Sequence, residues 1–501
     1  MKRNISNIFL SLIALAAMCF ASCTKFLTEE PKTFDSPETY YTTIDEMQSA
    51  VNGCYDGLTT AFTGVGLGLA LNTHVFFEGL TGLCWREQAG SEQFMGFDLP
   101  ILENQDGANS TIWQLYYKAI ENCNSTIWGI ENSEAAVSES DKNVLLSEVY
   151  FLRAYYYWRL VTMFGPIPYK VEKTIGTANS ALPLDTQETV INGCIEDLKY
   201  AEELAGSSWS RADGHVSKGA IKSLLAKLYM QKAGHPVYDN ASYALAYEKA
   251  KEVVNSGAFS LFTSYADLRN QANENMGEFI FSIQREKEHA GNPVVSNCYP
   301  LNSPFIAATV NNGGGFVPNQ SFVDSFEEGP RKDAFFYTEY PSFEDPSVTV
   351  KFTPHIYKFF DDSNDAIANN RYGMDYWVIR YADVLLLMAE AKAMADGGST
   401  SDAAAINAYH QVRSRAVNGA EKPSSITFNQ VFKERIHELA FENIAWFDMT
   451  RVRKAYDPVK DQVVDIIGHV AEGHDKHAFT ETDMYLPYPM RERKYNPNLV
   501  R

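Results

Sequence analysis

The chain has 501 residues, of which 45% are hydrophobic and 21% are charged, so it can build a large core and lacks the composition of a disordered protein. Asp and Glu (63) outnumber Lys and Arg (43), which argues against nucleic-acid binding, because phosphates require a basic face. Aromatic residues are abundant, with 28 Tyr, 30 Phe and 7 Trp, and these side chains either fill a core or hold ligands.

The N-terminal residues have the pattern of an export signal. Lys2 and Arg3 precede an apolar run over 8–18 that is too short to span a membrane, and Ala-Ser-Cys follows, ending at Cys23. A Cys in this position resembles a lipobox, so we expect residues 1–22 to be a lipoprotein signal peptide and Cys23 to carry the lipid. The alternative is an ordinary secretory signal in which Cys23 has no role.

The first long irregular region covers residues 61–110 and is rich in Gly, Asn and aromatic residues. Long loops of this kind are usually functional or disordered, and the aromatic content argues against disorder. Sugar rings stack their C–H faces on aromatic rings while polar side chains bind the hydroxyls, and Trp85 lies among such polar residues. The alternative is that Trp85 anchors the loop onto the helices. The candidate ligand-binding residues of this region are Phe76, Trp85, Arg86, Glu87 and Phe94.

Apolar residues at helical spacing predict helices that come in pairs. Residues 218–233 carry one apolar face, and a second helix follows that ends at Gly257. Similar pairs are predicted at 381–396 with 401–416 and, more loosely, at 144–163 with 190–205. Each pair has the size of a tetratricopeptide repeat, although no strict period links them. The sequence therefore predicts a mostly α fold with a tetratricopeptide-like helical-repeat scaffold.

A second irregular region covers residues 289–380, and no Pro/Ser-rich linker separates it from the helices. We therefore expect a single domain over 23–501, in which a loop-rich insertion packs on the scaffold. Tyr299, Asn302 and Phe316 form a second candidate ligand-binding cluster, for which the alternative is a set of hydrogen-bonded turns.

The five cysteines after Cys23 form no C-x-x-C pair, which predicts small buried side chains and neither a zinc site nor a disulfide framework. His469, His474 and His477 lack the H-E-x-x-H spacing, and 361–365 resembles only half of a calcium loop, so we expect no metal site. No cofactor is expected either.

Motifs of enzymes are absent from the sequence: there is no phosphate-binding loop, nucleophile elbow or dinucleotide fingerprint. We therefore expect a protein that is not an enzyme. A glycosidase needs only two carboxylates about 5–10 Å apart, so this alternative stays open.

Several segments of the chain form an ordered set of motifs. The most telling segment is 149–169, where Leu-Arg-Ala is followed by aromatic residues and Phe-Gly-x-Ile-Pro. The others are 113–124, Lys218-Gly219-Ala220, 379–391, 406–416, 434–451 and 486–498. Together these segments resemble the SusD/RagB family of surface lipoproteins. Asn443 stands where the family usually has Gly, and Ala445 where it usually has Arg.

This resemblance implies a mostly helical, SusD-like fold with a variable loop-rich region. It implies a lipoprotein anchored on the outer face of the outer membrane, which binds nutrients, mainly glycans, and is not an enzyme. The implied partner is a SusC-like TonB-dependent transporter, on which the protein acts as a lid. The alternatives are the same scaffold binding peptides or protein fragments and, from another class, a lipoprotein glycoside hydrolase.

The charged residues within these motifs are set among apolar neighbours, so we expect them to pair with one another as part of the scaffold. They are Arg153, Arg380, Glu390, Arg435, Glu438 and Asp448. The aromatic run 155–158 covers every side of a helix and is predicted to be buried, and Trp377 is predicted to lie in the core.

Overall fold

The computed structural model describes residues 40–63, 73–86, 106–174, 181–288, 291–300, 306–307, 316–369, 371–472 and 478–500. Several residues of the sequence analysis lie outside these ranges: Cys23, Glu87, Phe94, Asn302, His474 and His477.

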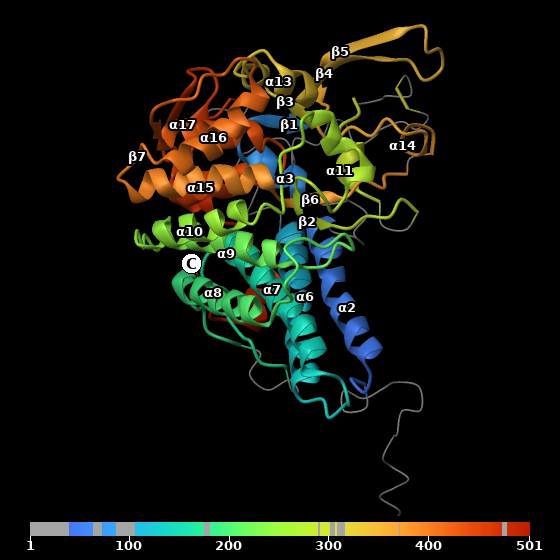
Figure 1. Ribbon diagram of the computed structural model, residues 1–501, viewed down its shortest axis with the longest axis vertical. Helices are drawn as coiled ribbons and strands as arrows, with labels where there is room; N and C mark the ends of the chain where they lie inside the picture. The colour runs from blue at the N-terminus through green and yellow to red at the C-terminus, as the bar shows by residue number, and fades with distance from the viewer. Residues whose placement is uncertain are drawn as a thin grey trace, which may run out of the picture.

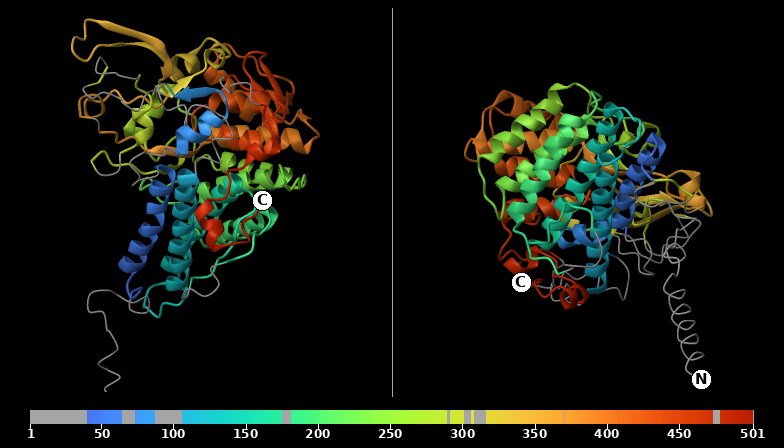
Figure 2. Two further views of the ribbon diagram at one scale, coloured as in Figure 1. Left: turned by 180° about the vertical axis from the view of Figure 1, so that it is seen from behind. Right: turned by 90° about the horizontal axis from the view of Figure 1, so that it is seen from below.

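Helices stacked side by side form the scaffold (Figure 1). The order of packing is α2 on α6, α6 on α7, and then α8, α9, α10, α15 and α16 in succession. The C-terminal residues pack against α6 (Figure 2). The helices are α2 (Ile44–Thr63), α6 (Asp106–Glu131), α7 (Glu139–Phe164), α8 (Gln187–Leu204), α9 (Lys218–Ala233), α10 (Ser242–Asn255), α15 (Tyr381–Ala395), α16 (Ala403–Ala416), α17 (Phe428–Glu438) and α18 (Ala445–Val452).

The predicted helix pairs are confirmed as α7 with α8, α9 with α10 and α15 with α16. Gly257 follows α10 with φ +66°, a left-handed conformation that suits glycine at the end of a helix. Gly219, in the first turn of α9, packs so closely on the carbonyl of Trp209 and the ring of Phe259 that a Cβ would clash. None of the described helices is long and apolar enough to cross a membrane.

Helix α7 is the centre of the scaffold and is buried along most of its length. As predicted, the aromatic run 155–158 is buried on all sides. Two of its hydroxyls donate to backbone carbonyls, from Tyr156 to Cys54 at 2.7 Å and from Tyr157 to Lys170 at 2.5 Å. A buried tyrosine needs such an acceptor, so these bonds fix α7 against its neighbours. The five described cysteines are buried and free, as predicted.

The regions predicted as irregular contain more regular structure than expected. Strands β4 and β5 form a hairpin, in which Tyr337 pairs with His355, and it projects from the loop-rich half of the molecule (Figure 1). The other elements in and around these regions are α3 (Thr73–Leu80), β1 (Cys84–Arg86), β2 (Phe279–Ile283), α11 (Pro293–Ser296), β3 (Phe316–Pro318), α12 (Gln320–Asp324), α13 (Pro330–Phe335), β4 (Phe336–Pro341), β5 (Thr349–Ile356), α14 (Asn364–Asn369) and β6 (Tyr376–Arg380).

The remaining short elements are η2 (Tyr265–Arg269), η3 (Gln271–Asn273), β7 (Ser399–Thr400), β8 (Ile426–Thr427), β9 (Lys454–Asp457), β10 (Gln462–Asp465), η4 (Glu481–Met484) and α19 (Met490–Tyr495). The described strands pair in antiparallel ladders of two: β1–β3, β2–β6, β4–β5, β7–β8 and β9–β10.

The charged motif residues form buried ion pairs, as predicted. Arg380 is fully buried and contacts Glu278, Glu438 and Glu442 at 2.6, 2.9 and 2.7 Å. Arg415 contacts Glu278 and Glu438 as well, at 2.5 and 2.7 Å. These cations hold the pKa of the Glu438 carboxyl well below its usual range despite its burial. The network joins the residue before β2 to α15, α16 and the end of α17.

The other motif charges are also paired. Arg435 contacts Asp448 at 2.7 Å and Glu390 at 3.4 Å. Arg153 takes a partner outside the motifs, Asp197 on α8, through two hydrogen bonds of 2.8 and 2.7 Å. Trp377 is buried, as predicted.

We predict that Arg380→Met lowers the free energy of unfolding by about 3–5 kcal/mol, because it leaves buried carboxylates without their cation. Urea denaturation of the mature protein would measure this loss. The matched control is Arg371→Met, whose half-exposed partner Glu288 lies 3.4 Å away, and a loss below about 1 kcal/mol is expected there. Equal losses in the two variants would contradict a structural role for the network.

Candidate functional site

Strand β1 places the backbone of the Trp85 segment beside residues 316–318 of the second irregular region. It pairs with β3 in antiparallel register, so that Trp85 faces Val317 and Arg86 faces Phe316. Successive side chains of a strand point to opposite faces, and the burial follows this rule, since Cys84 is 2% exposed and Trp85 is 36% exposed. The indole of Trp85 is therefore displayed on the surface. The side chains of Phe76, Arg86 and Phe316 lie outside the described part of the structure.

The base of this ladder is fixed to the rest of the protein. The backbone N–H of Asn319 donates to the carbonyl of Leu83 at 2.9 Å, and its side-chain amide donates to Gly82 at 2.7 Å and to Glu472 at 3.1 Å. The Cys84 thiol donates to the carbonyl of Glu78 at 3.4 Å. Hydrogen bonds thus hold the backbone of Trp85 from both sides, so little conformational entropy would be lost if its indole bound a partner.

Glu78 connects the Trp85 strand to the scaffold. Its buried carboxylate on α3 accepts a hydrogen bond from the backbone N–H of Asn443, just before α18. Asn443 has φ +57°, a left-handed conformation, which explains why the SusD/RagB pattern has Gly here; Asn is among the residues that tolerate it best. Burial raises the pKa of Glu78 to about 8.

Tyr299 does not have the exposure that the sequence analysis expected of a ligand-binding residue. It is 2% exposed, its hydroxyl donates to the carbonyl of Asp361 at 3.0 Å, and its ring packs edge-on against Phe360. Tyr299 was a candidate because its segment is rich in aromatic residues and Asn, but its ring packs into the core. It therefore supports the wall of a cleft and offers no face for stacking.

That cleft lies partly in the loop-rich region 289–380, but none of its lining residues was among the ligand-binding residues predicted from the sequence. It has a volume of about 460 Å³, which lies in the range of small-ligand sites. Its lining is polar: Gln271 donates to Asp361 at 3.1 Å, and Lys287 pairs with Asp365 at 2.6 Å. The lining residues are Ala266, Arg269, Asn270, Gln271, Lys287, Asp361, Asp362, Ser363, Asp365, Arg371 and Gly373. They come from residues 266–287 and 361–373, of which only 361–365 stood out in the sequence, as half of a calcium loop.

Within the ranges that the structure describes, no group of three or more His, Cys, Asp and Glu side chains is placed to hold a metal ion. Two carboxylates of 361–365 have partners: Asp361 accepts a hydrogen bond from the backbone N–H of Ser363 at 2.9 Å, and Asp365 pairs with Lys287 at 2.6 Å.

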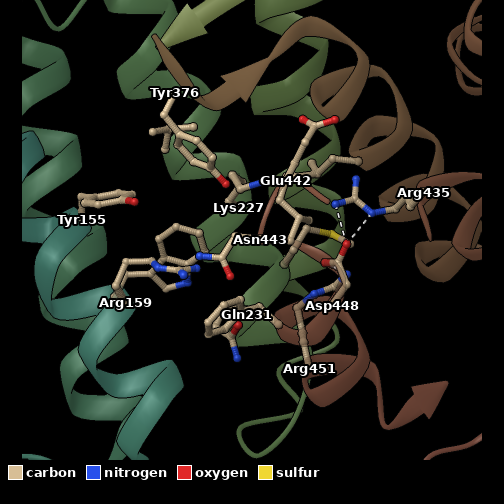
Figure 3. A pocket seen from close by; sticks show the side chains of 16 residues that line it. Tyr155, Arg159, Lys227, Gln231, Tyr376, Arg435, Glu442, Asn443, Asp448 and Arg451 are labelled. Atoms are coloured by element: carbon tan, nitrogen blue, oxygen red, sulfur yellow. Dashed lines mark hydrogen bonds and ion pairs between the residues drawn. The ribbon is translucent and has the colours of Figure 1, made fainter. Parts of the chain in front are cut away.

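A second cavity lies inside the helical scaffold, between α7, α9, β6 and α18 (Figure 3). Its volume is about 50 Å³, which is too small for a sugar ring. The cleft and the exposed face of Trp85, both on the loop-rich half, are therefore the candidate ligand sites.

We predict that ionisation of Glu78 lowers the free energy of unfolding as pH rises from about 5 to 8. The carboxyl ionises near 4.5 in the unfolded chain and near 8 in the folded protein, so the unfolded state binds fewer protons between these values. Its contribution is complete below pH 4.5 and is lost as pH rises through 8. Glu78→Gln keeps an acceptor for Asn443 and should make the slope of unfolding free energy against pH less negative by up to about 1.4 kcal/mol per pH unit.

Urea denaturation at pH 5.5, 6.5 and 7.5 would measure this difference. Glu134→Gln, at an exposed position, is the matched control and should leave the slope unchanged. An unchanged slope in the Glu78→Gln variant would show that the group does not titrate in this window.

Comparisons with known proteins agree with this architecture. The model of the SusD family matches residues 344–501, and the model described as starch-binding associating with outer membrane matches residues 26–230. The chain is similar to SusD-like protein P2 of Formosa agariphila, with 27% identity over 95% of both chains.

Solved structures share the fold. Surface glycan-binding protein A of Bacteroides thetaiotaomicron, solved in complex with laminarihexaose, has 17% identity and a TM-score of 0.73, with 91% of this chain and 98% of that chain covered. A SusD superfamily protein of Parabacteroides distasonis has 30% identity and a TM-score of 0.82, with coverage of 91% of this chain and 98% of that chain. The chain therefore belongs to the SusD/RagB family.

Proposed function

We propose that this protein is a surface lipoprotein that captures a glycan and delivers it, as a lid, to a SusC-like TonB-dependent transporter. The observation that carries the proposal is its full-length similarity to SusD-family proteins, together with a shared fold with a glycan-binding protein that holds laminarihexaose. The family description, starch-binding associating with outer membrane, points to the same ligand class and location.

In this proposal the exposed face of Trp85 is the stacking platform. The indole supplies a flat apolar surface that matches the C–H face of a pyranose, and the strand pairing brings residues 84–86 and 316–318 together around it. The other residues that we propose to bind the ligand, on the strength of the sequence alone, are Phe76, Arg86, Glu87, Phe94, Asn302 and Phe316. The polar cleft beside Asp361 supplies further donors and acceptors for hydroxyl groups.

The proposed anchor is the lipidated Cys23, which would hold the protein to the outer membrane facing the exterior. Several acyl chains on one cysteine make a firm anchor, since each buried methylene contributes about 0.8 kcal/mol. Capture and delivery require no bond of the ligand to be broken, so the proposal assigns no enzymatic activity.

Calorimetry with a panel of oligosaccharides and peptides tests the ligand class and the platform. We expect an oligosaccharide to bind and Trp85→Ala to weaken its binding by about 1–3 kcal/mol, because a stacking face is lost. Tyr495→Ala, which removes a 67% exposed ring on α19, is the control and should leave affinity unchanged. Binding of peptides alone, or new reducing ends in the glycan samples, would contradict the proposal.

Membrane fractionation tests the anchor and the partner. We expect the full chain to purify from outer membranes together with a TonB-dependent transporter, and Cys23→Ala to move the protein into the soluble fraction. Retention of the Cys23→Ala protein in the membrane, or purification of the full chain without a transporter, would count against the lid model.

A further inference from the structure

The cavity inside the scaffold contains a buried cation, Arg159, for which the described residues supply no carboxylate, whereas the cations of the buried networks are paired. Figure 3 shows it between α7, α9, β6 and α18. Its volume of about 50 Å³ corresponds to about four water molecules. Lys227, Val378 and Ile444 in its wall are half-buried, so the cavity reaches toward the surface. The lining residues are Tyr155, Trp158, Arg159, Lys227, Met230, Gln231, Tyr376, Val378, Leu387, Arg435, Glu442, Asn443, Ile444, Phe447, Asp448 and Arg451.

Three of the four cations in the wall have carboxylate partners. Lys227 pairs with Asp383, Arg435 with Asp448 at 2.7 Å, and Arg451 with Glu390 at 2.8 Å. These three cations and three carboxylates balance one another. The remaining carboxylate of the wall, Glu442, forms ion pairs with Lys358 and with Arg380, the latter at 2.7 Å.

Arg159 is the fourth cation. It is 6% exposed, and no carboxylate of the described residues forms an ion pair with it. Its Nε has no hydrogen-bond partner among those residues. The guanidinium stacks 3.8 Å from the ring centre of Phe447 and lies beside the phenol of Tyr116, and it points toward Asn443 in Figure 3. A buried cation without an anion is costly, which favours binding of a counter-ion.

Two further polar groups of the cavity lack partners within the described part of the chain. They are the indole Nε1–H of Trp158, next to Arg159 on α7, and the side-chain carbonyl of Asn443. Rotating the Asn443 amide by 180° would present its NH₂ group instead. Arg159, Trp158 and Asn443 can therefore supply several N–H donors to one small acceptor.

We propose that this cavity binds a short-chain carboxylate, of the size of formate or acetate, on Arg159. The planar guanidinium fits the two oxygens of a carboxylate through parallel N–H bonds. One negative charge neutralises Arg159, the cation of the wall for which the described residues supply no carboxylate, and the volume excludes a sugar or a larger acid. The rings of Phe447 and Trp158 and the side chains of Met230 and Val378 provide apolar contacts for a methyl group. This site is separate from the proposed glycan platform.

Thermal unfolding of the mature protein in sodium acetate, formate, chloride and sulfate at one ionic strength tests the proposal. We expect acetate and formate to raise Tm by about 2 °C at tenfold excess over Kd, and chloride and sulfate to raise it less. Arg159→Gln should abolish this difference, and Arg159→Lys, which keeps the charge but loses the fork, should respond equally to acetate and chloride. The exposed control Arg491→Gln should behave like the unmodified protein.

A second measurement needs no variant and so remains decisive even when substitution of Arg159 prevents folding. Saturation-transfer NMR should detect ¹³C-acetate bound to the unmodified protein, and formate should displace it. The absence of transfer, or the same acetate response in Arg159→Gln as in the unmodified protein, would overturn the proposal. A response to chloride equal to that of acetate would overturn the assignment of a carboxylate.

Discussion

The buried contact of Arg380 with three glutamates is the constraint on which the rest of the structure depends. Glu278 precedes β2, Glu438 ends α17 and Glu442 follows it. Arg380 itself ends β6 and immediately precedes α15. The guanidinium also donates to the carbonyl of Glu438 at 2.6 Å. Charges taken out of water are tolerated only in such complete arrangements. One side chain therefore fixes how the C-terminal helix pair meets the strands of the loop-rich half.

The same network reaches the proposed ligand platform through a short chain of contacts. Lys358 bonds to Glu442 and donates to the carbonyls of Glu438 and Ala440 at 2.9 and 3.0 Å, which shapes the turn before α18. In that turn Asn443 takes a left-handed conformation and directs its N–H to Glu78 on α3. Helix α3 leads into β1, which carries Trp85. The aromatic surface that would meet a ligand is thus positioned by charges that never contact it.

Local patterns predicted much of the scaffold but little of the long-range structure. The helix at 218–233 coincides with α9 because its apolar spacing is a property of the segment alone. The sequence indicated that Arg380 forms ion pairs, but it could not identify the partner Glu278, which lies 102 residues away and in none of the motifs. The hairpin β4–β5 was missed within a region whose Gly, Pro and Asn content suggests loops. The burial of Tyr299 depends on Phe360 and Asp361, which only the fold brings to it.

Helix α7 carries both the buried aromatic run 155–158 and Arg159, the arginine of the inner cavity. A helix that is buried on every side must place its tyrosine hydroxyls and its arginines against partners, and α7 does so for Tyr156, Tyr157 and Arg153. Arg159 is the arginine for which the described residues supply aromatic rings in place of a carboxylate. A stacked ring stabilises a cation less than an ion pair does once water is excluded. Of the two arginines on α7, Arg159 therefore retains the capacity to bind an anion.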